Sequence, residues 1–206
     1  SSAQDVGGTR SHLFTNTLID LSLDSFKKSM LQINYQKVSN DNYLKLFDLQ
    51  SPLLLDDNSV LESKIQFDLE HESYDLTTSF EMYETLSGSN SDRFQYVLPS
   101  YDFSKNFSLN NIDGSFNLNS YGNNTLNDTN VLASSISNDL NYSMLDKFFD
   151  NGIKTNFELA LKNINTVGKN NPIYKNSLQS ELMSAYTYNA SLPLIKKNVK
   201  TFNTLE

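Results

Sequence analysis

The sequence predicts an all-β fold of antiparallel strands joined by polar turns. Two observations carry this prediction. Apolar and polar residues alternate at period two in several segments, which places them on opposite faces of a strand. The uncharged polar residues are mainly Asn and Ser, which favour turns because their side chains compete for nearby backbone groups. A long helical protein would more typically use Ala, Glu and Lys.

The clearest alternation lies in residues 61–70, where the odd positions are mostly apolar and every even position is polar. Residues 74–82 continue the pattern with Tyr74, Leu76, Phe80 and Met82. Only residues 71–73 separate the two segments. They are therefore predicted to form a hairpin with a tight turn.

Further strands are predicted along the rest of the chain. Alternation is clear in residues 31–36, 116–119, 132–142 and 153–162, and weaker in 11–23, 43–49, 94–98, 101–107 and 174–188. The last segment also fits a helical spacing. Turn-rich connections are predicted at 56–59, 87–92, 122–128 and 168–172, and Asn151-Gly152 is a strong hairpin signal. No change in composition marks a second domain, so residues 1–206 are treated as one.

Composition and charge exclude several classes of protein. The net charge is −8 and the basic residues form no cluster larger than Lys196, Lys197 and Lys200, which argues against a nucleic-acid partner. The absence of Cys excludes disulfides and thiolate metal sites. Residues 1–9 do not resemble a signal peptide, and the sequence does not begin with Met. We therefore expect an internal piece of a longer protein.

Motifs for catalysis, cofactors or metals are not found. His12 and His71 are isolated, and His71 lies in an expected polar turn. Asp56-Asp57-Asn58 matches the start of a calcium loop, but Val60 replaces a ligand and the glycine is missing. The sequence therefore predicts no catalytic residues, no cofactor-binding residues, no metal site and no enzymatic activity.

Strand length leaves two architectures open. Several predicted strands span about 9–12 residues, whereas a soluble sheet typically has strands of about five or six. A tilted strand of about 9–11 residues crosses a bilayer. A soluble β-sandwich produces the same alternation, with its apolar face turned inward. Pattern alone does not decide between a membrane barrel and a soluble sandwich or adhesin-like binding module.

Several short segments occur in a recognisable order. They are Val38-Ser39-Asn40-Asp41-Asn42-Tyr43-Leu44, Tyr83-Glu84-Thr85-Leu86, Ser91-Asp92-Arg93-Phe94-Gln95-Tyr96-Val97-Leu98-Pro99-Ser100-Tyr101, Gly114-Ser115-Phe116-Asn117-Leu118, Thr129-Asn130, the strand at 138–142, and Leu192-Pro193-Leu194. In order and spacing they resemble the LptD barrel family, also called the organic-solvent-tolerance family. The resemblance extends from about residue 9 to residue 206.

The resemblance implies an antiparallel, up-and-down transmembrane β-barrel segment in the outer membrane of a Gram-negative bacterium. It would comprise about ten strands of a larger, incomplete barrel. Members of the family receive lipopolysaccharide from a periplasmic Lpt bridge through an N-terminal jelly-roll domain, hold an LptE-like lipoprotein inside the barrel and release lipopolysaccharide into the outer leaflet. The jelly-roll domain, a terminal aromatic residue and the family's cysteines are missing. We therefore expect the middle of such a barrel, without its lateral gate, and an alternative outer-membrane channel stays open.

A barrel would divide the alternating residues between lipid and lumen. The candidates for the lipid-facing band are Leu61, Ile65, Phe67, Leu69, Phe157, Leu159 and Leu161. The candidates for the lumen are Glu62, Lys64, Gln66, Asp68, Glu70, Lys154, Asn156, Glu158 and Lys162. Tyr35, Tyr83, Tyr96, Tyr101 and Tyr142 are candidates for an interfacial aromatic girdle. In a soluble sheet the same charged residues would form the solvated face.

Overall fold

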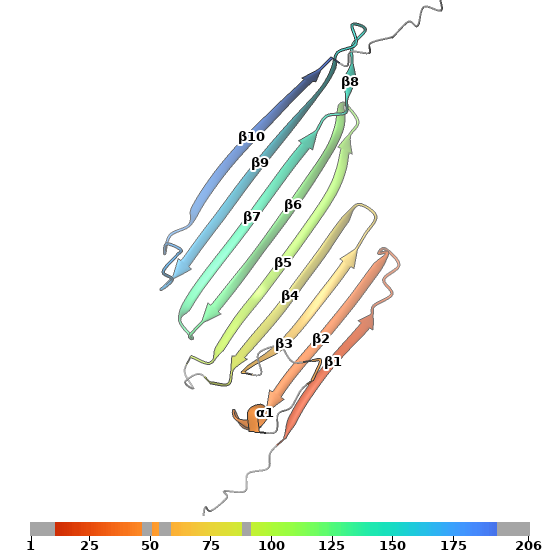
Figure 1. Ribbon diagram of the computed structural model, residues 1–206. Helices are drawn as coiled ribbons and strands as arrows, with labels where there is room; N and C mark the ends of the chain where they lie inside the picture. Colours follow the sequence, from red (N-terminus) through yellow and green to blue (C-terminus); the bar gives the residue numbers. More distant parts are fainter. Residues whose placement is uncertain (1–10, 47–50, 54–58, 88–91, 193–206) are drawn as a thin grey trace, which may run out of the picture.

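The computed structural model describes residues 11–46, 51–53, 59–87 and 92–192 (Figure 1). These residues form ten strands and one helical turn. The elements are β1 (His12–Asp20), β2 (Lys28–Val38), α1 (Tyr43–Leu46), β3 (Val60–Glu70), β4 (Tyr74–Thr85), β5 (Phe94–Leu109), β6 (Ile112–Asn127), β7 (Val131–Ser143), β8 (Lys147–Phe148), β9 (Lys154–Lys169) and β10 (Gln179–Ser191).

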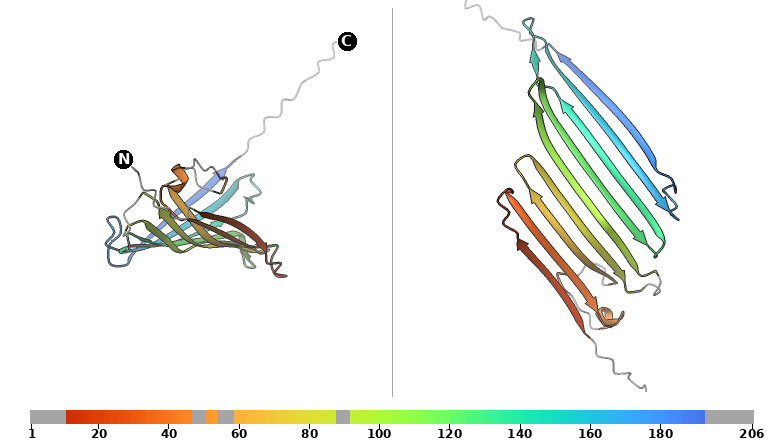
Figure 2. Two further views of the ribbon diagram at one scale, coloured as in Figure 1. Left: turned by 90° about the horizontal axis from the view of Figure 1, so that it is seen from below. Right: turned by 180° about the vertical axis from the view of Figure 1, so that it is seen from behind.

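All ten strands belong to one antiparallel sheet. Its order is β1-β2-β3-β4-β5-β6-β7-β9-β10, and the short β8 pairs with β9. Consecutive long strands are therefore neighbours, as in an up-and-down meander. Within the described residues β1 pairs only with β2 and β10 only with β9, so the sheet is open. Figure 2 shows the described strands as a single curved and twisted layer.

The predicted all-β antiparallel fold is confirmed. The strands expected at 31–36, 61–70, 74–82, 116–119, 132–142 and 153–162 lie in β2, β3, β4, β6, β7 and β9. The hairpin at 71–73 forms as expected, and its turn is closed by the His71 N–H, which donates to the Tyr74 carbonyl over 2.8 Å. The Asn151-Gly152 turn joins β8 to β9, with Gly152 at φ 81°. A side chain would be strained at that φ.

The strand expected at 43–49 is wrong where the structure describes it, because residues 43–46 form α1. Residues 47–49 lie outside the described part. Local hydrogen bonds favour the helical turn: the Asn40 side chain accepts from the Asn42 N–H over 2.9 Å, and the Asn40 carbonyl accepts from the Tyr43 N–H over 3.0 Å. Asn side chains commonly start turns in this way.

The two strands expected at 94–98 and 101–107 are one continuous strand, β5. Pro99 lies between the two expected segments, and proline has no N–H for a ladder hydrogen bond. In the ladder between β4 and β5, the register shifts between Ser79 and Glu81 of β4. In the ladder between β5 and β6, it shifts between Val97 and Ser100 of β5. Leu98 and Pro99 therefore form a β-bulge, which accommodates the proline without ending the strand.

The turn expected at 122–128 is also wrong. Residues 122–127 continue β6, and the chain turns at 128–130 instead. A Cβ at Gly122 would lie 2.7 Å from the Tyr101 ring and 3.0 Å from the Ser135 carbonyl oxygen. Gly122 thus leaves room for the Tyr101 ring rather than turning the chain. Near the C-terminal side, residues 168–169 belong to β9, and β10 begins at Gln179 rather than at Tyr174.

The register staggers the strands. A row of paired residues that starts at Asp20, the last residue of β1, passes through Met30, Asp68, Thr77, Asp102, Tyr121, Ser137 and Ile164. It reaches β10 at Glu181, near the start of a strand that continues to Ser191. Successive strands are therefore displaced in one direction. Strands that close into a barrel need such a shear, because they tilt against the barrel axis.

Few side chains are buried. The buried apolar residues of the described part are Val38, Leu44, Leu61, Leu86 and Val97. Val38, Leu61 and Leu86 form a cluster with Leu44 of α1, and Phe14 and Tyr43 pack against it. This cluster lies at the end of the sheet that carries α1, here called the α1 end. The opposite end carries the tight turns at 71–73 and 110–111 and is called the hairpin end (Figure 1).

Substitution of Gly122 by Val should destabilise the sheet by about 1–3 kcal/mol, because the new side chain overlaps the Tyr101 ring and the Ser135 carbonyl. Thermal unfolding followed by circular dichroism measures the effect. The double variant Gly122→Val, Tyr101→Ala should lose less stability than the two single variants added together. Strictly additive losses would contradict the close contact between Gly122 and Tyr101.

Candidate membrane-contact surface

The register places most large apolar side chains on one side of the sheet. Paired residues share a face, so Ile33, Ile65 and Phe80 lie side by side across β2, β3 and β4. The same holds for Leu118, Leu140 and Leu161 across β6, β7 and β9. This side is called the apolar face. Of the lipid-band candidates, Leu61, Ile65, Phe67, Leu69, Phe157, Leu159 and Leu161 all lie on it.

Away from the α1 cluster, no other described element covers the apolar face. Ile65 is 43% exposed and Phe80 44%, although both lie in the middle of the sheet. On the edge strand β10 the exposed fractions rise to 74% for Leu182 and 78% for Tyr186. Contiguous exposed apolar surface of this kind marks an interaction surface. Leu61 differs from the other band candidates because it is only 1% exposed and belongs to the α1 cluster.

A shallow groove crosses the apolar face between β2 and β5. Its apolar lining comes from Ile33, Ile65, Phe80, Met82, Tyr96 and Leu98. Because the bulge at residues 98–99 inserts an extra residue into β5, Leu98 joins this lining beside Phe80. The groove is open and mainly apolar rather than an enclosed pocket.

Aromatic rings follow the hairpin end of the apolar face. Tyr74 and Phe103 have ring centroids 5.9 Å apart, and Phe107 and Phe116 are 5.2 Å apart. Phe116 continues to Tyr142 at 4.8 Å, and Tyr142 to Phe157 at 6.2 Å. We call these six residues the aromatic row. Rings in such a row have an apolar body with polar tips on the tyrosines, as at membrane interfaces.

The five girdle tyrosines do not all share one face. Tyr142 lies in the aromatic row, and Tyr35, Tyr96 and Tyr101 lie on the apolar face nearer the α1 end. Tyr83 lies on the opposite face, where it pairs with Glu62 and donates a hydrogen bond to the Glu81 carboxylate over 2.7 Å. Its position in the sequence near a strand end did not reveal its face.

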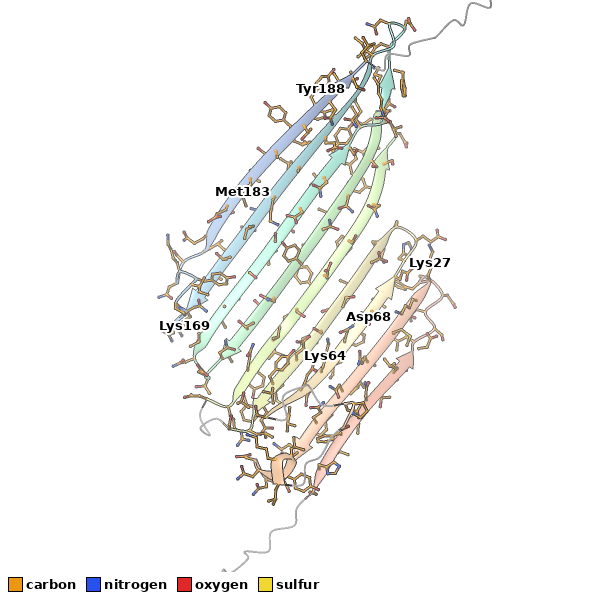
Figure 3. The ribbon with its side chains drawn as sticks, viewed as in Figure 1. Lys27, Lys64, Asp68, Lys169, Met183 and Tyr188 are labelled. Carbon is orange, nitrogen blue, oxygen red and sulfur yellow. The ribbon has the colours of Figure 1, made fainter. Side chains whose placement is uncertain are left out.

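The other side of the sheet is polar. It carries the nine lumen candidates, which are Glu62, Lys64, Gln66, Asp68, Glu70, Lys154, Asn156, Glu158 and Lys162. Lys64 and Asp68 are labelled along β3 in Figure 3. Glu81 is held by Ser79 and Tyr83, each over 2.7 Å, and pairs with Lys64 at 3.4 Å. Charges on this face are therefore partly neutralised by their neighbours.

Farther along the polar face, uncharged groups dominate. Asn106, Asn117 and Asn119 form a hydrogen-bonded ladder, and Asn123 accepts from Ser135 over 3.0 Å. Lys162 bonds the Tyr121 hydroxyl at 3.1 Å and Asp139 at 3.3 Å. Amides and hydroxyls both donate and accept, so this face can hydrogen-bond water, a polar partner or a saccharide.

A strip of polar residues interrupts the apolar face on β6 to β10. The Ser120 hydroxyl donates to Asn138 over 2.7 Å and also contacts the Tyr101 hydroxyl at 3.1 Å. Asn165 donates to Asn163 over 2.5 Å, and Asn163 donates to the Ser180 hydroxyl over 3.3 Å. We call Ser120, Asn138, Asn163, Asn165 and Ser180 the Asn/Ser strip. Sequence alternation did not predict it, because Asn at alternate positions looks the same on either face.

An ion cluster joins three of the segments on which the resemblance rests. Arg93, just before β5, pairs with Asp41 at 2.7 Å and with Glu84 at 2.9 Å. Lys37 also pairs with Glu84 at 3.1 Å. The hydrogen bond to Asp41 raises the pKa of Arg93, and the charge of Glu84 adds to this. The side chain of Glu84 is only 6% exposed, so its charge depends on these cations.

Each of the two histidines contacts a neighbouring hydroxyl group. His12 contacts the Tyr43 hydroxyl at 3.2 Å, and His71 contacts the Ser73 hydroxyl at 3.2 Å in the predicted turn. In the part of the chain that the structure describes, no group of three or more His, Cys, Asp or Glu residues is arranged to hold a metal ion. The possible calcium loop at 56–58 lies outside the described residues.

No helix in the described ranges is both long and apolar enough to cross a membrane.

Comparison with known proteins does not assign the chain to a family. No protein-family model matches the chain, and no curated protein matches its sequence.

Replacement of Arg93 by Met should destabilise the α1 end by about 3–5 kcal/mol, because Glu84 would keep a buried charge while losing its main partner. Lys37→Met is the matched control. Lys37 is 52% exposed, so its loss should cost about 1 kcal/mol or less. Thermal unfolding compares the two variants, and hydrogen exchange of α1 locates the change. Equal effects of the two variants would refute a special role for Arg93.

Proposed function

We propose that this chain is a segment of an outer-membrane β-barrel that passes lipopolysaccharide to the outer leaflet. The observation that carries the proposal is the two-sided sheet: an uncovered apolar face on one side and a hydrogen-bonding polar face on the other. In a bilayer only the apolar face can meet lipid, and the polar face must line an aqueous interior.

Strand length and stagger support a membrane location. The strands β5, β6 and β9 each have 16 residues, and β7 and β10 have 13. A bilayer-spanning strand needs about 9–11 residues at a tilt of about 45°. The remaining length can extend beyond the hydrocarbon at either end. The one-directional stagger of the strands is what tilted strands require.

Strand direction supports a larger assembly. The sheet path has β1 at one edge and β10 at the other, and every neighbouring pair is antiparallel. Figure 1 shows β1 and β10 pointing the same way. Direct closure of β1 on β10 would therefore give a parallel pair, whereas single-chain bacterial barrels are antiparallel throughout. An antiparallel barrel needs further strands between these two edges, as proposed for a barrel larger than this segment.

The cargo is proposed from the resemblance to the LptD barrel family together with the chemistry of the polar face. Lipopolysaccharide has a saccharide part that forms many hydrogen bonds. The amide and hydroxyl groups around Asn117, Asn119 and Asn123 offer matching donors and acceptors. The same face would accommodate an LptE-like lipoprotein, and the periplasmic Lpt bridge would dock on an N-terminal domain of the longer protein. Transport then requires passage along a polar surface, without any chemical step.

The proposal is tested by depletion of the full-length protein from cells. Lipopolysaccharide delivery to the cell surface should fall, measured by surface labelling of newly made lipopolysaccharide. Normal delivery after depletion would exclude this cargo. If the protein instead conducts ions in planar bilayers and depletion leaves delivery intact, a diffusion channel with the same architecture is the better description.

A charge placed on the apolar face distinguishes a membrane barrel from a soluble sheet. Ile65→Lys should prevent assembly into the outer membrane, because a lysine near the bilayer centre costs about 2–4 kcal/mol. Gln66→Lys, its neighbour on the polar face, should assemble normally. Heat-modifiable mobility in detergent extracts of outer membranes measures assembly. Wild-type protein that washes off the membrane without detergent would favour a soluble β-sandwich instead.

A further inference from the structure

Two hollows adjoin each other on the apolar face, toward the α1 end of β2. The first is the apolar groove between β2 and β5. The second lies beside the edge strand β1 and is here called the edge hollow. Its lining includes His12, Leu13, Tyr35, Lys37 and Ser39. Because Tyr35 lines both hollows, they form two parts of one surface site.

Two departures from regular strand pairing border the groove. On its β5 side, the bulge at residues 98–99 sets two residues opposite Phe80, and a bulge bends its strand. On its β2 side, the ladder between β2 and β3 ends at the pair Asn34 and Lys64. Beyond that pair, the hydroxyl of the small residue Ser63 accepts a hydrogen bond from a backbone N–H of β2 over 3.2 Å. The groove therefore lies where the regular ladder gives way on both sides.

The groove presents mainly hydrocarbon. Its polar neighbours direct their polar groups elsewhere: Lys64 and Glu81 pair with each other at 3.4 Å on the polar face, and the Ser63 hydroxyl bonds the backbone of β2. The side chains of Ile65 and Phe80 are 43% and 44% exposed within the groove. The hydrophobic effect has no preferred direction, so a flexible acyl chain can fill an open groove of this kind.

The edge hollow adds a cation to this apolar surface. Lys37 follows Ile33 and Tyr35 on the same face of β2, and its side chain is 52% exposed. It is the outer member of a chain of ion pairs that runs through Glu84, at 3.1 Å, to Arg93, which lies 2.9 Å from Glu84. The Lys37 ammonium can therefore turn to a ligand while the buried Glu84 keeps Arg93 as its partner.

Ser39 supplies a second polar group. Its Oγ accepts a hydrogen bond from the Ser11 N–H over 2.8 Å, which leaves its own hydrogen to donate. An ammonium and a hydroxyl that line one hollow are both donors suited to a phosphate oxygen. Tyr35 lies between these donors and the apolar groove. A tyrosine ring and a lysine at the border of an apolar surface are typical of a membrane interface.

We propose that this site binds one glycerophospholipid, with an acyl chain in the groove and the phosphate at Lys37 and Ser39. The inference rests on the proposed membrane barrel and adds a discrete lipid site to its outer wall. The half-exposed Lys37 gives charge complementarity to an anionic headgroup. Among the described residues the site offers a single groove and a single ammonium group on this face. The lipid part of lipopolysaccharide, with several acyl chains and more than one phosphate, fits it less well.

Photolabelling of the full-length protein in a non-ionic detergent tests the site. The probe is phosphatidylglycerol with a diazirine near the end of one acyl chain, and mass spectrometry maps the labelled residues. Labels should concentrate on groove residues such as Ile65, Phe80 and Leu98. Labels spread evenly over the apolar face would indicate lipids that merely surround the protein and would overturn the proposal.

Filling the groove gives a matched comparison. Ile65→Trp places a larger ring in the groove, whereas Ile136→Trp makes the same change on the apolar face outside it, at a position of nearly equal exposure. Labelling of Phe80 and Leu98 should fall about tenfold in Ile65→Trp, the effect of losing contact with about two methylene groups. Ile136→Trp should leave it unchanged. Both variants keep an apolar side chain toward lipid, so both should assemble. Equal losses in the two variants would contradict a discrete groove site.

The headgroup contact is tested with Lys37→Met. Labelling by phosphatidylglycerol should fall about tenfold, as expected for one lost charge-assisted hydrogen bond. A diacylglycerol probe with the same chain has no phosphate, so it should label the variant and the wild-type protein alike. Lys105→Met is the control, because Lys105 also lies on the apolar face, paired with Leu118, but lines neither hollow. Equal losses with both probes would overturn the role of Lys37. Lipopolysaccharide that displaces the probe more strongly than unlabelled phosphatidylglycerol would overturn the choice of lipid.

The state of the wild-type protein separates this inference from the proposed function. If the protein is heat-modifiable in extracts of outer membranes but the labels spread evenly, only the lipid site fails. If the protein is recovered in the soluble fraction without detergent, the membrane proposal itself fails and the lipid site is lost with it.

Discussion

The structure depends on one constraint: a single antiparallel sheet must keep its register across all its long strands. Because side chains alternate along each strand, a slip of one residue would move a strand's apolar residues to the polar face. Continuous pairing from β1 to β10 keeps Ile33, Ile65 and Phe80 together across β2, β3 and β4, and Leu140 and Leu161 together across β7 and β9. With no second layer packed on the described sheet, the segregation of its two faces is its main organising feature.

The departures from ideal strands preserve that register. The bulge at Leu98 and Pro99 takes up one extra residue in β5, so that Tyr96 and Phe103 remain on the same face on either side of it. Gly122 allows the Tyr101 ring to lie over β6 without forcing the two strands apart. The ladder between β2 and β3 ends toward the α1 end at the pair Asn34 and Lys64. Beyond it, the Gln36 side-chain oxygen accepts a hydrogen bond from the Glu62 N–H. The small buried cluster around Leu44 fills this end.

The buried apolar residues are concentrated at one end of the sheet. In a soluble sheet the residues of the apolar face become the core, but here the buried apolar residues gather at one end while Ile65 and Phe80 remain exposed in the middle. A contiguous exposed apolar surface of this kind marks an interaction site. The face extends across the long strands and is bordered by aromatic rings at the hairpin end. The proposed function assigns this face to the hydrocarbon layer of a membrane.

The sequence by itself determined the strands with clear alternation and the separation of polar from apolar positions. Period two needs only local information, and residues 61–70 show both faces without knowledge of any neighbour. It could not determine three features that depend on contacts between distant residues. In the sequence, Gly122 and the asparagines after it suggest a turn. The structure shows instead that Gly122 lies within β6 and leaves room for the Tyr101 ring. Asp41 and Arg93 are far apart in sequence, and only the tertiary structure brings them together. The register between strands decided on which face Tyr83 and the Asn/Ser strip lie. The sequence could not, because a polar residue in a polar run can lie on either face of a strand.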